Sequence, residues 1–283
     1  MKTINTITNL KEERKKYRDA SIGFVPTMGY LHEGHLSLIE QSKNENDITI
    51  VSIFVNPTQF SPTEDFAAYP RDLEKDEGIL KELNVDLLFY PDAEDMYPQG
   101  FATYAEVEKM SAVLCGKFRP THFRGVATVV LKLFNIVQPD NAYFGQKDAQ
   151  QVIILKRMTT DLNLDVTIKT LPIKRDPDGL AMSSRNVYLS PAEREAALRL
   201  PRALQQAKEQ IEKGLRNVFE IKAGIESELK KSPLITTDYV EIVTLDQLQP
   251  VSGYEVDTSN TLAAAAIRVG KTRLIDNFIL GEL

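Results

Sequence analysis

Apolar, β-branched runs alternate with helical patterns over the first 175 residues, and this alternation restricts the fold more than any other feature of the chain. The expected strands are 22–27, 47–55, 86–90, 142–144 and 166–171. The expected helices are 36–45, 72–83, 125–137 and 148–162. Strands that are apolar on both faces and separated by helices predict a doubly wound parallel sheet, covered on both sides. Ligands of such sheets bind beyond the carboxyl ends of the strands.

The pattern changes near Pro191, where two long polar–apolar helices are expected, over 191–214 and 218–231. Three strand-like runs follow, at 238–244, 262–269 and 272–280, and Gly270-Lys271 between the last two is typical of a hairpin. Helices followed by an antiparallel sheet predict a separate, smaller α+β domain over 187–283. The segment 176–186, DPDGLAMSSRN, is rich in turn-forming residues and predicts a hinge after an α/β domain of residues 1–175.

The charge balance argues against several classes of partner. The chain has 34 basic and 40 acidic residues, a net charge of −6, whereas proteins that bind nucleic acids or membrane surfaces generally are basic. Residues 1–18 are polar, unlike a secretory signal, and no apolar run approaches the ~20 residues of a membrane helix. Cys115 is the only cysteine and cannot form an internal disulfide. We expect a soluble, cytoplasmic protein without nucleic-acid or membrane partners.

The segment 26–35, PTMGYLHEGH, leads from the first expected strand into the first helix. Its glycines allow close backbone approach, and a helix N-terminus offers N–H groups and partial positive charge, so the segment is typical of an anion site. His32 and His35 add donors for phosphate oxygens. A surface turn with inactive histidines is the alternative. Zinc is disfavoured because the spacing is not H-E-x-x-H and Cys115 and His122 would have to complete the ligand set.

Amide side chains follow the second expected strand, in the segment NPTQF. Asn56 and Gln59 would face the same edge of the sheet as the histidines. The amide of Gln59 offers both a donor and an acceptor, which suits a small hydroxy acid. An ordinary polar turn is the alternative.

A second phosphate-binding pattern follows the strand 142–144, in the segment FGQKDAQQ. Lys147 suits a phosphate clamp, and Asp148 either binds a ribose hydroxyl or only begins a helix. Gln151 lies one helical turn after Lys147, so both can face the ligand. The pattern supports a nucleotide site because it repeats, at another strand end, the chemistry of the histidine segment.

Two further segments carry basic residues. Residues 182–185, MSSR, suit a mobile phosphate lid, although a capping loop with an incidental arginine is the alternative. Residues 115–124, CGKFRPTHFR, contain three fixed cations and no acid, which favours an anionic ligand over a solvated loop. Cys115 itself is expected to be a small buried residue.

Five segments in this order, PTMGYLHEGH, VSIFVNPTQF, FGQKDAQQ, DGLAMSSRN and RLIDNFIL, resemble the pantoate–β-alanine ligase (pantothenate synthetase) family over nearly the whole chain. The first also resembles the H-x-G-H signature of the wider nucleotidylyltransferase group, and the fourth resembles that group's flexible K-M-S-K-S-type loop. The resemblance implies a Rossmann-like amino-terminal domain, a smaller carboxy-terminal lid domain and a homodimer.

The implied reaction uses ATP and Mg²⁺ in two steps. The carboxylate of pantoate attacks the α-phosphorus, which gives pantoyl adenylate and pyrophosphate. The amine of β-alanine then attacks the activated carbonyl, which releases AMP and forms pantothenate. Carboxylate attack needs no proton abstraction, so we expect the histidines to stabilise developing negative charge rather than to donate a proton. The sequence indicates no dedicated base for the amine.

The resemblance also assigns roles to residues of this chain. Catalytic roles fall to His35, which matches the family's acid, and to His32 and Lys147. The implied nucleotide contacts are Met28, Gly29, Tyr30, Leu31, His32, Glu33, Gly34, His35, Gly145, Gln146, Lys147, Asp148, Lys174, Met182, Ser183, Ser184 and Arg185. The substrate contacts are Gln59, Gln151 and Asn56.

Three positions depart from the family pattern. Lys174 replaces a frequent aliphatic residue at an adenine contact, Thr121 replaces a usual glycine, and Gln146 replaces a usual glutamate. The Mg²⁺ ligands stay open, with Asp76 and the ATP phosphates as candidates.

Three other functions are considered. They are another nucleotidylyltransferase, a class I aminoacyl-tRNA synthetase fragment, and a non-catalytic nucleotide-binding module. The glutamines and the second domain disfavour the first, and the acidic charge disfavours the second. The third would not need Lys147, Gln59, Gln151 and the lid together.

Overall fold

The computed structural model describes residues 1–62 and 64–283, which form two compact units. Unit 1 comprises Met1–Ser111, Arg119–Gly145 and Ile154–Leu171. Unit 2 comprises Ala112–Phe118, Gln146–Ile153 and Pro172–Leu283. Three short segments of the expected first domain, 1–175, therefore belong to unit 2: 112–118, 146–153 and 172–175.

A six-stranded parallel sheet forms the centre of unit 1, in the order β1-β4-β3-β2-β5-β6. The strands are β1 (Lys2–Ile4), β2 (Ile22–Thr27), β3 (Ile48–Ile53), β4 (Leu87–Phe89), β5 (Asn141–Gly145) and β6 (Thr167–Leu171). From β2 the chain proceeds outward through β3 and β4, whereas β5 and β6 extend the sheet on the other side. The point of reversal between β2 and β5 is where ligands of such sheets bind. The predicted α/β class is confirmed.

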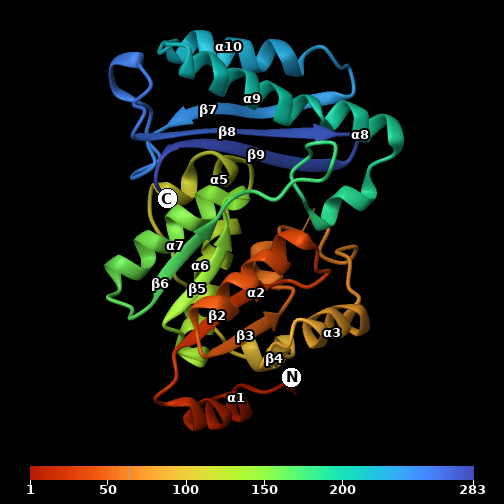
Figure 1. Ribbon diagram of the computed structural model, residues 1–283, viewed down its shortest axis with the longest axis vertical. Helices are drawn as coiled ribbons and strands as arrows, with labels where there is room; N and C mark the ends of the chain where they lie inside the picture. The colour runs from red at the N-terminus through yellow and green to blue at the C-terminus, as the bar shows by residue number, and fades with distance from the viewer. Residues whose placement is uncertain (63) are drawn as a thin grey trace. The chain divides into compact units, whose positions relative to one another are not determined.

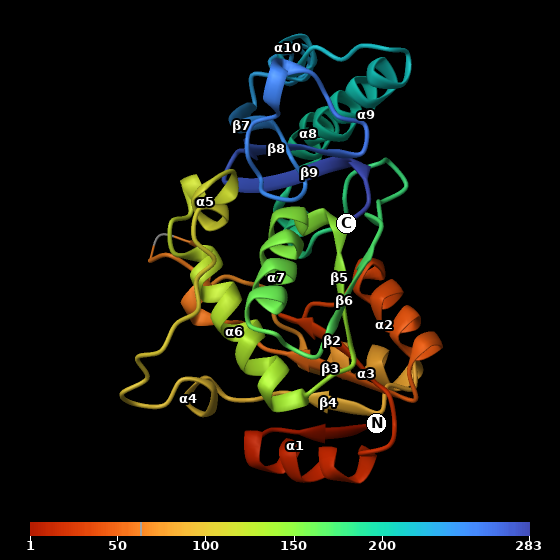
Figure 2. The same cartoon turned by 90° about the vertical axis from the view of Figure 1, so that its left-hand side faces the viewer.

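Helices cover both faces of this sheet. They are α1 (Ile7–Arg14), η1 (Lys15–Tyr17), α2 (Glu33–Glu45), η2 (Pro57–Gln59), α3 (Leu73–Glu82), α4 (Ala93–Met96), α6 (His122–Val137) and α7 (Ala149–Asp161, in unit 2 up to Ile153). Figure 2 shows α2 and α3 on one face and α6 on the other. Leu38 and Ile39 of α2 and Leu80 of α3 pack against Val25 and Val51. Strands with buried side chains on both faces explain the nearly continuous apolar runs.

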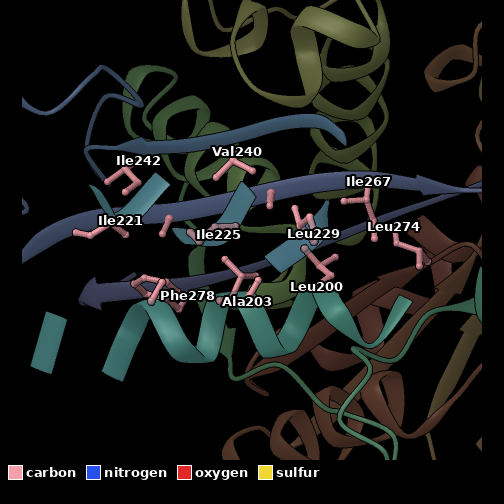
Figure 3. Close-up of a cluster of buried hydrophobic side chains, with 14 of the residues drawn as sticks. Leu200, Ala203, Ile221, Ile225, Leu229, Val240, Ile242, Ile267, Leu274 and Phe278 are labelled. Atoms are coloured by element: carbon pink, nitrogen blue, oxygen red, sulfur yellow. The ribbon is translucent and has the colours of Figure 1, made fainter. Parts of the chain in front are cut away.

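Unit 2 contains a three-stranded antiparallel sheet in the order β7-β8-β9. The strands are β7 (Ile235–Val243), β8 (Asn260–Val269) and β9 (Thr272–Gly281). The helices of this unit are α5 (Cys115–Phe118), η4 (Gln146–Asp148), η5 (Ser184–Tyr188), α8 (Pro191–Ala197), α9 (Arg199–Glu212), α10 (Val218–Leu229) and η6 (Ser252–Tyr254). The short helix η3 (Met110–Ala112) begins in unit 1, and its last residue belongs to unit 2. Val269 pairs with Thr272 around the predicted hairpin turn. Figures 1 and 3 show α9 and α10 against one face, where Ala203, Ile225 and Phe278 point into a shared apolar core.

One local prediction is wrong, and two elements were not predicted. The expected helix 191–214 is two helices, α8 and α9, separated at Leu198. Pro201 has no N–H to donate to the carbonyl of Ala197, which explains the break. The amino-terminal residues, expected only to be polar, form β1 and α1; β1 is short and lies at the sheet edge, so no apolar run marks it.

Candidate active site

The loop between β2 and α2 contains two consecutive residues with left-handed backbone, Gly29 at φ +80° and Tyr30 at φ +53°. The N–H of Gly29 donates to Oγ1 of Thr27 over 3.1 Å. A Cβ on Gly29 would lie 2.9 Å from both Oδ2 of Asp76 and Cγ2 of Ile53. Glycine is therefore required here by both conformation and space.

The carboxylate of Asp76, on α3, accepts hydrogen bonds from the backbone of this loop. Its Oδ2 accepts the N–H of Tyr30 over 2.7 Å, and its Oδ1 accepts the N–H of Leu31 over 2.8 Å. Asp76 is 1% exposed, and burial raises the pKa of its carboxyl, against the two backbone hydrogen bonds that lower it. Both oxygens of Asp76 therefore brace the loop, while its candidacy as a magnesium ligand stays a prediction.

His32 and His35 begin α2 and cap it mutually. The N–H of Gly34 donates to Nδ1 of His32 over 3.1 Å, and the N–H of His32 donates to Nδ1 of His35 over 3.3 Å. The ring centroids are 4.1 Å apart. Since each Nδ1 accepts a backbone N–H, the neutral ring carries its proton on Nε2. The fold thus fixes two imidazoles in the tautomer that donates from Nε2.

Asn56 and Gln59 lie at the carboxyl end of β3, beside the loop after β2. Nδ2 of Asn56 donates to Oε1 of Gln59 over 3.0 Å and to the carbonyl of Gly125 over 3.1 Å. Its Oδ1 accepts the hydroxyl of Tyr97 over 2.7 Å, and Asn56 is 1% exposed. Nε2 of Gln59 donates to Sδ of Met28 over 3.2 Å. A thioether is a weak acceptor, so this amide is suited to donate to a stronger oxygen acceptor.

The backbone of Gln59 is held by side chains from the segment 119–125. Nδ1 of His122 donates to the carbonyl of Gln59 over 3.0 Å, and Nε2 of His122 accepts from Arg119 over 3.0 Å. Arg119 forms a two-point ion pair with Glu64, at 2.6 and 2.9 Å. A Cβ on Gly125 would lie 2.4 Å from the carbonyl oxygen of Thr58.

The prediction of an anionic ligand for the segment 115–124 therefore needs correction at Arg119, whose partner is Glu64. The acid lies 55 positions earlier in the chain, so the local excess of cations did not reveal it. Arg124 stacks on the ring of Tyr104 at 4.7 Å. Thr121 has φ −100°, a conformation open to any residue, so the usual glycine is not required there.

Within unit 2, η4 carries the second predicted phosphate segment. Gly145 ends β5 in unit 1, and Gln146, Lys147 and Asp148 form η4. Nζ of Lys147 lies 3.7 Å from Oδ2 of Asp148, and both side chains keep solvent contact, 22% and 48% exposed. Gln151, half-buried, lies one turn later on α7. Lys147 thus supplies a cation at the start of a helix.

The predicted lid comes after β6 in the chain and belongs to unit 2. The carbonyl of Lys174 accepts the N–H of Met182 over 3.0 Å, whereas the side chain of Lys174 is exposed. Oγ of Ser183 caps η5 by accepting the N–H of Arg185 over 3.3 Å. Ser184 is 8% exposed, and Met182, Ser183 and Arg185 are half-buried. Hydrogen bonds within the segment therefore contribute to holding this turn.

The structure thus brings Met28 and Gln59 into contact, stacks His32 beside His35, and places Asn56 behind Gln59, all in unit 1. Glu33 and Gly34 form the first turn of α2. Asp76 as a brace and Glu64 as the partner of Arg119 were missed, since neither belongs to a local motif. Within residues 1–62 and 64–283, no group of three His, Cys, Asp or Glu side chains could hold a metal ion, and no helix is long and apolar enough to cross a membrane.

Comparison with known proteins identifies the family. The family model described as "Pantoate-beta-alanine ligase" matches residues 2–279. The chain belongs to this family. The resemblance carried by the five sequence segments is confirmed.

Members of the pantoate–β-alanine ligase family resemble this chain over its whole length. The pantothenate synthetase of Caldicellulosiruptor bescii is 55% identical over 282 residues, 99% of each chain. The crystal structure of pantothenate synthetase from Thermus thermophilus has a TM-score of 0.94 at 45% identity and covers 100% of both chains. The Francisella tularensis ligase, described as complexed with beta-gamma ATP and β-alanine, has a TM-score of 0.82 at 38% identity and covers 99% of this chain and 97% of its own.

Proposed function

We propose that this chain uses ATP to join pantoate to β-alanine through pantoyl adenylate, forming pantothenate, AMP and pyrophosphate. The family match over residues 2–279 supports the overall reaction. The structural observation that carries the proposal is the pair of Nε2–H imidazoles at the start of α2, preceded by a loop in which Met28 contacts the amide of Gln59. Donors of fixed direction are what a polyphosphate leaving group needs.

In the first step, His32 and His35 would donate from Nε2 to phosphate oxygens of ATP and stabilise the charge that develops on pyrophosphate. The positive end of α2 would add to the same attraction, as would the backbone from Met28 to Leu31. Lys147 of unit 2 would contribute a fixed positive charge and Asp148 a ribose contact. Because pantoate attacks as a carboxylate, none of these groups has to remove a proton.

Pantoate recognition would fall to Gln59 and Gln151. Gln59 supplies an amide whose present partner, Met28, is weak, so a substrate oxygen can replace the sulfur at little cost. Asn56 is buried and its amide is bonded on both sides, so we assign it to orienting Gln59 rather than to direct contact. In the second step, the neutral amine of β-alanine attacks the acyl carbon, the bond from that carbon to the phosphate oxygen breaks and releases AMP, and the proton of the amine leaves to water or to phosphate.

ATP would also use the lid, the proposed hinge 176–186 between domains 1–175 and 187–283. Ser183, Ser184 and Arg185 suit the phosphates, and the backbone of Lys174 and Met182 suits the adenine. Mg²⁺ would be held by the phosphates and water, as is common for this ion. The described part of the chain provides no carboxylate cage for it, and no step here depends on one.

The proposal is tested by incubating the protein with ATP, pantoate and β-alanine, omitting each in turn, and measuring product mass. We expect pantothenate and AMP only in the complete mixture. Exchange of label between pyrophosphate and ATP should require pantoate but not β-alanine. Lys147→Ala should slow that exchange roughly 10²–10³-fold. ADP as product, or exchange without pantoate, would contradict the proposal. Light scattering in solution tests the homodimer, and cell fractionation tests the cytoplasmic location.

A further inference from the structure

The segment RLIDN of β9 carries two buried polar residues to which the reaction has given no role. Asp276 is 2% exposed and Asn277 is 5% exposed. They pair across the sheet with Ala265 and Ala264, whose small side chains leave room on both faces. Successive side chains of a strand point to opposite faces, so the two residues serve opposite sides of the same sheet. Buried polar groups in a strand require partners.

Asn277 binds the backbone of η4. Its Nδ2 donates to the carbonyls of both Gln146 and Lys147, each over 3.0 Å. Its Oδ1 accepts from Nε2 of Gln146 over 3.2 Å. Carbonyl oxygens only accept, so the atom that faces two of them is the amide nitrogen, and the orientation of the side chain is fixed. Asn277 therefore holds the residue that carries the proposed phosphate clamp.

Asp276 binds the base of the lid. Its carboxylate accepts two N–H groups of Arg175, over 2.6 and 3.0 Å, in the two-point geometry that constrains orientation most. Oδ1 also accepts the backbone N–H of Asn277 over 2.8 Å. Arg175 forms a β-bridge with Ala181, next to the bond between Lys174 and Met182. One carboxylate thus connects Asn277 to the base of the predicted lid.

We propose that Asp276 and Asn277 are positioning residues that set η4, with Lys147, and the base of the lid, at Arg175, in fixed places on β9. The pair touches no reacting atom. Its function is to hold the lysine and the lid for ATP, and the proposal rests on the ligase function above. Displacing a positioned group by about 1 Å can cost roughly 10²-fold in rate, so a buried amide far from the chemistry can control it.

Two substitutions of Asn277 separate positioning from packing. Asn277→Asp keeps the shape but opposes a carboxylate to two carbonyl oxygens, whereas Asn277→Ala removes the side chain. We expect both to lower kcat/KM for ATP in pyrophosphate exchange, by about 10- to 100-fold, with Asp at least as harmful as Ala. A role in packing alone predicts the reverse order, because Asp fills the same volume as Asn and Ala leaves a cavity. An Asn277→Asp enzyme closer to wild type than Asn277→Ala would overturn the proposal.

A double-mutant cycle tests whether Asn277 acts through Lys147. In the Lys147→Ala background, we expect Asn277→Ala to lower exchange by less than about 3-fold, because the group that it positions is gone. Independent, multiplicative effects would overturn the proposal. Thr261→Val is the matched control: Thr261 is a buried residue of neighbouring β8 that donates to the carbonyl of Asp257 over 2.6 Å. It should lower thermal stability and leave the KM for ATP unchanged.

Arg175→Lys tests the contact with Asp276 independently, so the proposal can still be tested if the Asn277 variants do not fold. Arg175 is 35% exposed, and lysine keeps its charge but loses the two-point contact with Asp276. We expect the KM for ATP to rise about 3- to 10-fold. An unchanged KM would overturn the role of Asp276. Absence of exchange in the wild type would instead contradict the ligase function and is thereby distinguished from failure of this inference.

Discussion

The loop after β2 and Gln59 in unit 1, proposed to bind ATP and pantoate, are held differently from the lid of unit 2. In unit 1, the loop after β2 is supported by Asp76, and Gln59 is supported by Asn56; both supporting residues are 1% exposed. In unit 2, the lid beyond Arg175 is held by short-range turns and by ion pairs of Arg194 with Asp176 and Asp178, whose side chains are 22–35% exposed.

This difference has energetic consequences. A buried donor or acceptor that loses its partner costs about 1–3 kcal/mol, whereas an exposed ion pair contributes about 0–1 kcal/mol. The loop of unit 1 is therefore built in one geometry before any ligand binds. The lid of unit 2 can change its local contacts at small cost, which is what closure over a phosphate requires. Each prediction below tests one side of this contrast.

The largest effect is expected at His35, where two functions of one ring can be separated. Asn can accept the capping N–H in place of Nδ1 but has no atom at Nε2, whereas Gln can place an amide donor there. We expect His35→Asn and His35→Ala to slow pyrophosphate–ATP exchange roughly 10²–10³-fold, and His35→Gln to recover part of the loss. If His35→Asn retains full exchange, the ring serves only as a helix cap.

Asp76→Asn tests the brace of the same loop. One carboxylate oxygen becomes an NH₂ group that faces a backbone N–H, so we expect a loss of about 2–3 kcal/mol in stability and a higher KM for ATP. Chemical denaturation and exchange kinetics measure the two effects. Asp72→Ala is the control for helix stability, because it removes only the N-cap of the same helix, which accepts the N–H of Lys75 over 3.1 Å. A KM that rises equally in both variants would show that Asp76 acts through helix stability alone.

The sequence predicts the elements that a short stretch of residues determines, and it misses those that depend on contacts with distant residues. The run DITIVSIFV contains β3, and IGFVPT coincides with β2, because central parallel strands bury both faces. β1 is three residues long and gains its place only by pairing with β4, so no local pattern could mark it. The break at Leu198 was missed because apolar periodicity continues through it, although Pro201 was a visible sign.

The same distinction applies to the site. Reactive residue types at strand ends, such as His35 and Gln59, stand in local motifs and were predicted as candidates. The supporting roles were not predicted, because Asp76, considered only as a candidate Mg²⁺ ligand, contacts Leu31 across 45 positions, and Glu64 contacts Arg119 across 55. In the sequence, Asp76 and Glu64 cannot be distinguished from acidic residues of the surface; only the fold shows that they are buried or partly buried.

Glu64→Gln tests the support of Gln59 and its pH dependence. Burial raises the pKa of Glu64, but hydrogen bonds and charge from Arg119 outweigh it, so the pKa lies below its usual 4.5. A lowered pKa in the folded state stabilises the protein above about pH 4.5 and loses that contribution as the pH falls through the folded-state value. We expect a loss of about 2 kcal/mol at pH 7 that shrinks below pH 4.5.

Denaturation with urea at several pH values measures this difference. Glu12→Gln is the matched control, because Glu12 forms an exposed pair with Lys15. It should leave stability nearly unchanged at every pH. A Glu64→Gln loss that is constant from pH 7 to pH 3.5 would show that charge is not what Arg119 recognises.

The smallest effect is expected in the lid, at Asp178. Its pKa is lowered by the hydrogen bond from Arg194, but both side chains are about one-third exposed. Asp178→Asn should change the free energy of unfolding by about 0–1 kcal/mol, and added salt should reduce that change further, because exposed ion pairs are screened. Denaturation at low and high salt measures it. A loss above about 2 kcal/mol, insensitive to salt, would mean that the lid is fixed as firmly as the loop after β2, and the contrast between the two units would fail.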